Sequence, residues 1–278
     1  MNLKFVVNDY VVIWNLLFQS SISESIHQLK QKLWKNHKEE YNLTYKDNLV
    51  ILKDPKNFIP NNDTIYNLIL DNNGYEALKK STEKYRVDML KVWDERKKET
   101  TKILKDLLRF DIKVCHVLIV PPKLDIVDTT NVKNKKVNTI TWGKKIDTDK
   151  TKTITELIYR IVLSEMKNYN EEYKDIVMAI IELAILNEFH TRLSGKSHYL
   201  TGDTSLNYLK RQIYPYWLMY MGVSRDDMLG FMMRDKIAFD LEKYTNERDL
   251  KSVDLYTFID FCIKNQRHIL KIEELEII

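Results

Sequence analysis

The chain has 278 residues and a formal net charge of +4, because 44 lysine and arginine residues stand against 40 aspartate and glutamate residues. This balance is too weak to indicate a nucleic-acid or membrane partner by itself, and a hydrophobic fraction of 44% argues against disorder. Only 6 glycines and 5 prolines occur, which argues against collagen-like, elastic and glycine-looped nucleotide-binding designs.

Cysteine usage and the amino-terminal segment indicate the compartment. Cys115 and Cys262 are far apart and form no CxxC pair, so we expect a reducing compartment, the cytoplasm. The apolar run Val11–Phe18 is interrupted by Asn15 and is followed by no cleavage site of the signal-peptide type. No apolar stretch reaches the roughly eighteen residues that a membrane span requires, so we expect no membrane association.

Strands are expected mainly in the first half of the chain. Short apolar runs predict strands near residues 3–7, 114–120 and 137–142, the last two as a hairpin-like pair or as neighbouring strands. Residues 49–52 fit either a strand or a loop.

Helical spacing occupies much of the remaining sequence. In the first half, helices are expected over residues 11–18, 22–34 and 64–70, and one or two long, highly charged helices over 75–110. In the second half, they are expected over residues 153–166, 173–193, 205–221, 225–244 and 255–265. The sequence therefore predicts an α+β fold, with a mixed α/β part over residues 1–150 and a helical part over residues 151–278.

Several sequence features resemble ligand sites, but each has a simpler structural interpretation. The Gly195-Lys196 pair lacks the upstream glycine of a phosphate-binding loop, so we expect Gly195 to end a helix. His190 and His198 are too far apart to bind zinc from one helix, and no metal or other cofactor is expected.

A set of lysines brackets the predicted strand 137–142 and its Trp142. These lysines are Lys133, Lys135, Lys136, Lys144, Lys145, Lys150 and Lys152. Lysine with an aromatic residue is compatible with binding a nucleic-acid backbone. However, Asp147 and Asp149 interrupt the run, and the chain is barely basic, so we expect solvated loops and no nucleic-acid partner.

Two helices in the second half hold the most informative polar residues. In the helix 153–166, Glu156 and Arg160 are four residues apart and are expected to form an ion pair on the polar side. In the helix 173–193, Glu182 is surrounded by apolar residues on nearly all sides, and a buried carboxylate needs a partner. The expected partners are Arg160, Tyr159 or a metal, unless Glu182 lies partly exposed in a cleft.

The order of elements after residue 114 resembles zinc-dependent metallopeptidases of the HExxH class, especially their glutamate-ligand branch. A strand followed by two prolines leads to a polar loop, a strand ending in Trp142-Gly143, one helix, and a second buried helix with a glutamate. In that family, two histidines four residues apart bind zinc, the intervening glutamate is the general base, and a later glutamate completes the site. The corresponding pentad here is residues 155–159, and the later glutamate corresponds to Glu182 or Glu188.

The departures from the family pattern determine the functional expectation. Thr155 and Tyr159 stand where both zinc histidines would be, so the resemblance implies a zincin-like fold without zinc. We therefore expect a noncatalytic protein- or peptide-binding or regulatory module. Hydrogen bonds among Tyr159, Arg160 and the glutamates are expected to fill the space of the metal, and the strand 137–142 to receive a peptide by β-addition.

The candidate binding residues are Trp142, Thr155, Glu156, Tyr159, Arg160, Glu182 and Glu188, and Glu156 is the candidate catalytic residue. One alternative is a hydrolase that uses Glu156 and Glu182 as paired carboxylates with assistance from His190. Another is an α-rich protein- or nucleic-acid-interaction protein unrelated to peptidases.

Overall fold

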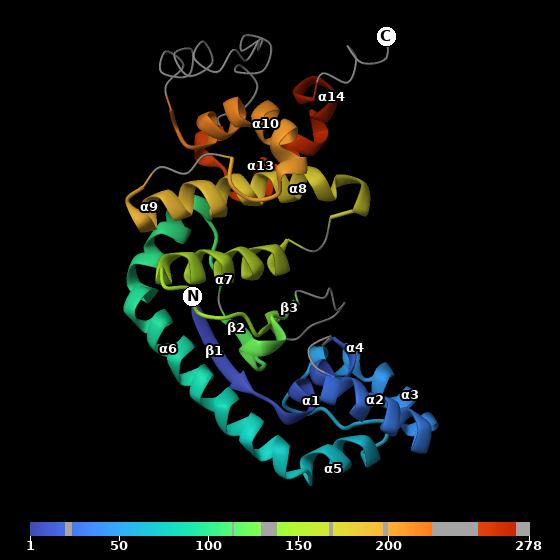
Figure 1. Ribbon diagram of the computed structural model, residues 1–278. Helices are drawn as coiled ribbons and strands as arrows, with labels where there is room; N and C mark the ends of the chain where they lie inside the picture. The colour runs from blue at the N-terminus through green and yellow to red at the C-terminus, as the bar shows by residue number, and fades with distance from the viewer. Residues whose placement is uncertain are drawn as a thin grey trace. The chain divides into compact units, whose positions relative to one another are not determined.

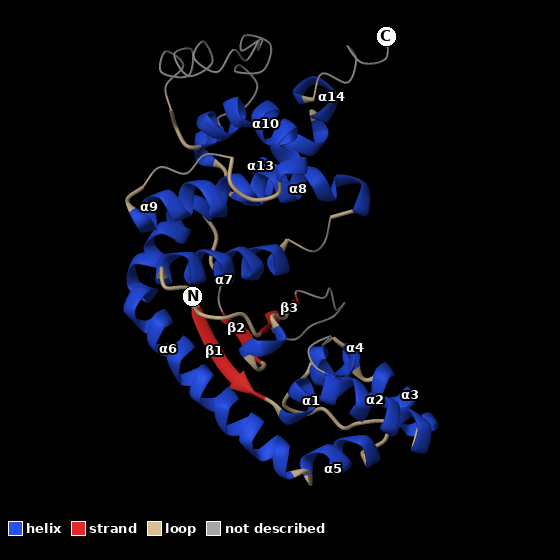
Figure 2. Ribbon diagram, viewed as in Figure 1, coloured by secondary structure: helices blue, strands red, loops and turns tan. Residues whose placement is uncertain are grey.

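The computed structural model describes residues 1–19, 24–112, 114–128, 138–166, 169–196, 200–223 and 250–270 (Figure 1). These residues form an α+β fold with one small sheet and many helices, which confirms the predicted class (Figure 2). The expected helix over 225–244, residues Lys133, Lys135, Lys136 and His198, and the last eight residues (271–278) lie outside the described ranges.

The chain divides into two compact units. The first contains Met1–Lys97 and Ile112–Ile154, and the second contains Lys98–Asp111 and Thr155–Ile278. The chain passes from the first unit to the second between Ile154 and Thr155, near the start of the helix that begins at Lys150, and residues 98–111 also belong to the second unit.

The sheet belongs to the first unit and has the strand order β1-β2-β4-β3. Strands β1 (Asn2–Val7), β2 (Val114–Ile119) and β4 (Asn138–Trp142) run parallel, and the short β3 (Val127–Asp128) is antiparallel to β4. The three predicted strands are present, and the expectation that the strands 114–120 and 137–142 are neighbours is confirmed. The hairpin alternative for β2 and β4 is wrong, because a hairpin requires antiparallel strands.

Strand β4 is not the edge strand that the β-addition hypothesis requires. Its Thr141 and Trp142 pair with Asp128 and Val127 of β3 on the side opposite β2. Each of the four residues from Thr139 to Trp142 is buried. A peptide therefore has no free backbone to pair with along this end of β4.

Most helices of the first unit precede β2 in the chain. They are α1 (Asp9–Phe18), α2 (Glu24–Asn36), α3 (Lys38–Lys46), α4 (Asn48–Lys53), α5 (Thr64–Leu70) and the first part of α6 (Asn73–Leu108). One hydrophobic core joins α1, α4 and α5 to the end of β2 at Leu118 and Val120. The charged segment 75–110, expected to form one or two long helices, forms the single helix α6 up to Leu108.

The expectation of a strand or loop over residues 49–52 is wrong, because this segment lies within α4. Ile51 and Leu52 are buried in the core that includes α1 and α5. A short apolar run has too little periodicity to distinguish a strand from a buried helix, and here the packing against α1 decides between them.

The second unit is helical. After the first turns of α7 (Lys150–Glu165), it contains η2 (Glu171–Tyr173), α8 (Lys174–Ile181), η3 (Glu182–Phe189), α9 (His190–Ser194), η4 (Thr204–Leu206), α10 (Asn207–Tyr220), η5 (Leu250–Ser252), α13 (Leu255–Lys264) and α14 (Gln266–Ile269). Helix α8 packs against α10 and α13. No helix within the described ranges is both long enough and apolar enough to cross a membrane.

Segments α8, η3 and α9 continue one another without a break from Lys174 to Ser194, and η3 has π-helical hydrogen bonding. Gly195 follows with a φ of 68° and its amide bonds to the carbonyl of Thr191. This left-handed glycine ends the helix, as its sequence predicted.

Arg109, just beyond the end of α6, joins segments within the second unit. Its guanidinium donates to the carbonyl oxygens of Tyr220 at 2.7 Å and Val253 at 2.9 Å. The same group lies 4.1 Å from the centre of the Tyr220 ring. One side chain therefore holds the end of α10 and the start of the α13 region to the end of α6.

Candidate functional site: a buried glutamate–lysine pair

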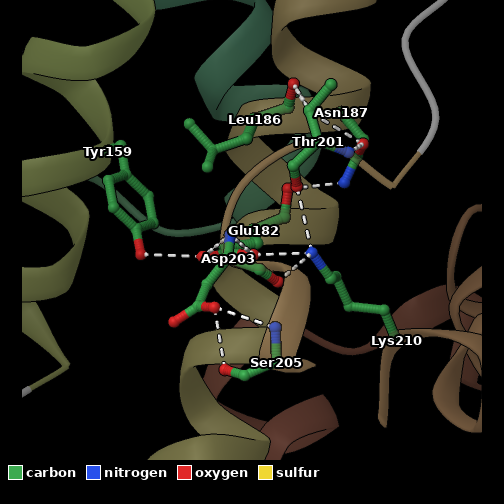
Figure 3. A network of polar contacts seen from close by, with 8 residues as sticks. All are labelled: Tyr159, Glu182, Leu186, Asn187, Thr201, Asp203, Ser205 and Lys210. Carbon is green, nitrogen blue, oxygen red and sulfur yellow. Dashed lines mark hydrogen bonds and ion pairs between the residues drawn. The ribbon is translucent and has the colours of Figure 1, made fainter. Parts of the chain in front are cut away.

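The strongest polar cluster of the second unit is centred on Glu182, at the start of η3 (Figure 3). Its Oε2 lies 2.8 Å from Nζ of Lys210, which projects from α10. Glu182 is 2% exposed and Lys210 is 0% exposed, so both charges are removed from water. A buried carboxylate needs such a partner because desolvation of a lone charge costs far more than a hydrogen bond returns.

The carboxylate of Glu182 has two further donors. The backbone N–H of Asp203 lies 3.2 Å from Oε1 and 3.1 Å from Oε2, and the hydroxyl of Tyr159 on α7 donates to Oε1 at 3.3 Å. Burial, and then the charge of Glu182, raise the pKa of Tyr159, so its hydroxyl remains protonated and able to donate.

The ammonium group of Lys210 is equally well satisfied. Besides Glu182, it donates to the carbonyl oxygens of Thr201 and Asp203, each at 3.1 Å. A lysine ammonium has three hydrogens, and here each has an acceptor. The pair therefore uses its hydrogen-bonding capacity on groups of the protein itself.

The loop between α9 and η4 is fitted closely onto Glu182. Gly202 has a φ of 103°, and a Cβ atom at this position would lie 2.3 Å from Oε2 of Glu182. Asp203 accepts from the amide and the hydroxyl of Ser205 at 2.9 and 2.8 Å, and these bonds lower its pKa. Only glycine leaves room for the loop to approach the carboxylate in this backbone conformation.

Asn187 joins the same loop to the π-helical segment. Its amide nitrogen donates to the carbonyl of Glu182 at 3.0 Å, and its Oδ1 accepts from the backbone N–H of Thr201 at 2.9 Å. The Thr201 hydroxyl bonds to the carbonyl of Leu186 at 2.8 Å. π-Helical segments often mark functional sites, and here the segment anchors the loop that encloses the ion pair.

Thr155, which stands at the other position expected for a zinc histidine, makes a second buried polar contact. Oγ1 of Thr155 lies 2.7 Å from Nδ1 of His190, and both side chains are buried. Thr155 and Tyr159, one turn apart on α7, thus contact different residues of the α8–η3–α9 run: His190 and Glu182.

Arg160, Glu188 and Glu156 are the remaining predicted site residues on α7 and η3. Arg160 lies over the ring of Tyr159, with Cζ 5.4 Å from the ring centre, and its Nε has no hydrogen-bond partner in the structure. Glu188 accepts from Arg192 at 2.7 Å on a partly exposed face of the helix. Glu156 is half-buried on α7.

Trp142 belongs to the sheet of the first unit and is fully buried. Its side chain therefore offers no exposed surface to a peptide, and its role in binding stays a prediction. Complete burial of a large apolar ring at the end of β4 accounts for a tryptophan at this position.

The sequence analysis identified Glu182 and Tyr159, but it missed Lys210, Thr201 and Asp203. A signal for Lys210 is present, because it shares one helical face with Leu206, Ile213 and Trp217, all of which are buried. A lysine on an apolar face indicates a buried acid elsewhere in the fold.

The donor set does not fit a zinc ion. Threonine and tyrosine hydroxyls are poor zinc ligands, and the lysine ammonium lies on the carboxylate oxygen that would bind the metal. No group of three histidine, cysteine, aspartate or glutamate residues in the described part of the chain is arranged to hold a metal ion. The same ion pair opposes the paired-carboxylate alternative, because Glu182 is already committed to Lys210.

Comparison of the chain with protein-family models, with curated proteins and with solved structures found no significant match.

Proposed function

We propose that this chain is a noncatalytic protein of the zincin-like type that acts by binding a protein or peptide partner. The observation that carries the proposal is the Glu182–Lys210 pair, in which the charge opposite the glutamate comes from an ammonium and not from a metal. An amine fully engaged by three acceptors supplies no activated water and no open coordination position.

The order of elements supports the zincin-like part of the proposal. Strand β4 leads through Gly143 to α7, which has Thr155 and Tyr159 one turn apart, and the next helical run bears Glu182. Tyr159 and Glu182 contact each other, as do Thr155 and His190. We infer that these contacts occupy the place of the two lost imidazoles and their metal.

Peptide hydrolysis tests the noncatalytic part. The purified chain, incubated with a mixture of unstructured peptides and with added zinc, is expected to cleave no faster than buffer. Zinc-dependent cleavage that a Glu156→Gln change abolishes would overturn the proposal and favour the hydrolase alternative.

A designed zinc site tests the zincin-like part. The variant T155H/Y159H/K210M places imidazoles four residues apart and removes the competing ammonium. Zinc at a hundredfold excess over its dissociation constant is expected to stabilise this variant by about 2.7 kcal/mol. The matched control K210M, which lacks both histidines, is expected to show no such rise in Tm. Equal behaviour of the two variants would contradict the zincin-like geometry and favour an α-rich interaction protein unrelated to peptidases.

A further inference from the structure

An aromatic surface lies on α2 and α3 of the first unit, which pack side by side (Figure 1). Trp34 on α2 is 44% exposed and Tyr45 on α3 is 60% exposed. Tyr41 lies between α2 and the core, with its ring centre 5.8 Å from that of Trp34 and 4.9 Å from that of Phe18. We call Trp34, Tyr41 and Tyr45 the aromatic face.

Contacts with α1 hold Tyr45 of the aromatic face in place. Tyr45 packs against Phe18 at 5.3 Å, and the indole N–H of the buried Trp14 donates to the Tyr45 carbonyl at 3.2 Å. On the outer side, Nζ of Lys38 lies 5.2 Å from the centre of the Trp34 ring. Exposed aromatic side chains that are already ordered lose little entropy on binding, and such residues dominate the energy of protein interfaces.

The charge around the aromatic face is positive. Residues 24–46 contain five lysines (Lys30, Lys32, Lys35, Lys38 and Lys46) and three glutamates (Glu24, Glu39 and Glu40), with no arginine or aspartate. Lys35 and Lys46 are exposed and lie about 100° around their helices from Trp34 and Tyr45, so they flank the rings and do not cover them. Glu40 lies on the opposite side of α3 from Lys38 and Tyr45, whereas the exposed Glu39 lies seven residues before Lys46 and on the same side of the helix as that lysine.

We propose that the aromatic face docks an acidic, amphipathic peptide segment of a partner protein. Apolar side chains of the peptide would cover Trp34 and Tyr45, and its carboxylates would lie against Lys35, Lys38 and Lys46. The small local excess of five lysines over three glutamates suits a few carboxylates better than the closely spaced phosphates of a nucleic acid. This proposal takes from the proposed function only the idea that the partner is a protein or peptide. It depends on no residue of the Glu182 cluster.

Tryptophan fluorescence provides a specific test. Trp34 is 44% exposed, whereas Trp14, Trp93, Trp142 and Trp217 are at most 4% exposed, so quenching by iodide reports mainly on Trp34. The probe is a tryptophan-free peptide of glutamate and leucine with helical spacing, added to the full chain. The peptide is expected to reduce iodide quenching severalfold, and Y45A, which removes an exposed ring of the aromatic face but keeps Trp34 as the reporter, is expected to need at least tenfold more peptide for the same protection.

Charge reversal separates docking from nonspecific attraction. K35E/K46E is expected to weaken binding of the glutamate–leucine peptide at least tenfold, whereas the matched control K84E/K97E, on exposed positions of α6, is expected to leave it unchanged. Equal effects of the two reversals would overturn the proposal, as would protection of Trp34 by a thymidine oligonucleotide in place of the peptide. Protection that grows with the concentration of the chain alone would identify a second copy as the occupant. Because peptide hydrolysis and the designed zinc site are measured separately, failure here leaves the proposed function standing and removes only this surface.

Discussion

Two buried acids in this molecule are stabilised in opposite ways. In the second unit, Glu182 is paired with a buried lysine. In the first unit, Asp47, which is 0% exposed, accepts from the backbone and side-chain nitrogens of Asn61 at 3.2 and 2.6 Å and from the Tyr66 hydroxyl at 3.1 Å. These three hydrogen bonds all come from neutral donors. One acid is neutralised by an opposite charge, and the other is solvated by dipoles.

The two buried acids differ in whether a structural role accounts for them. Burial raises the pKa of Asp47, and its hydrogen bonds with Asn61 and Tyr66 oppose that rise only in part. This acid fastens the turn-rich segment before α5 to the start of α4, which is a structural task. A buried ion pair such as Glu182–Lys210 often stabilises a fold no more than apolar residues of similar volume would. Its presence in the core therefore points to a role beyond stability.

Removing the lysine is expected to have the largest effect. K210M leaves Glu182 buried without its cation and should lower the free energy of unfolding by about 3–5 kcal/mol, measured by urea denaturation. The double variant E182Q/K210M removes both charges and is expected to recover much of this loss. A double variant as unstable as K210M would show that packing around Lys210, and not charge, dominates.

Changes at Asp47 are expected to be smaller and to depend on pH. D47A leaves the donors of Asn61 and Tyr66 without an acceptor and should cost about 1–3 kcal/mol. Because the pKa of Asp47 is higher in the folded chain than its ordinary value of 3.8, the folded state binds the proton more tightly. The contribution of this group to stability is therefore fully present below pH 3.8 and is lost as pH rises through the raised folded pKa.

D47N tests that sign. The amide keeps an acceptor for Asn61 and carries no charge, so the stability of D47N relative to the unchanged chain is expected to rise with pH through this window and then remain level. Urea denaturation of both proteins from about pH 3 to about pH 7 measures the difference. A relative stability of D47N that falls with rising pH would contradict a raised pKa at Asp47.

The sequence predicts some elements of this fold better than others. Elements with strong periodicity or clear boundaries, such as α5 and β2, lie where the sequence placed them. The segment of α4 was expected to be a strand or a loop, and no element was expected over α3; both helices are short and pack against α1, which the sequence pattern does not show.

At the site, an acid in an apolar helix correctly indicated that Glu182 needs a partner, and Tyr159 was among those named. The lysine was not found, because its sequence position in α10 gives no distance to η3 until the helices are packed. The loop from Thr201 to Asp203 was equally inaccessible, since its role depends on backbone groups that every residue possesses.

The smallest predicted effects compare the tyrosines of the two sites. Y66F and Y159F each remove one hydroxyl and keep the ring, so each should cost about 0.5–1.5 kcal/mol in urea denaturation. The loss is expected to be larger for Y66F, because Asp47 keeps only Asn61 as a donor, whereas Glu182 keeps Lys210 and the Asp203 amide. Y66F also removes a hydrogen bond that lowers the pKa of Asp47, so the pH at which stability levels off should move upward. Equal losses and an unchanged pH profile would mean that the two acids are held alike, and the contrast between charge and dipoles would not describe this fold.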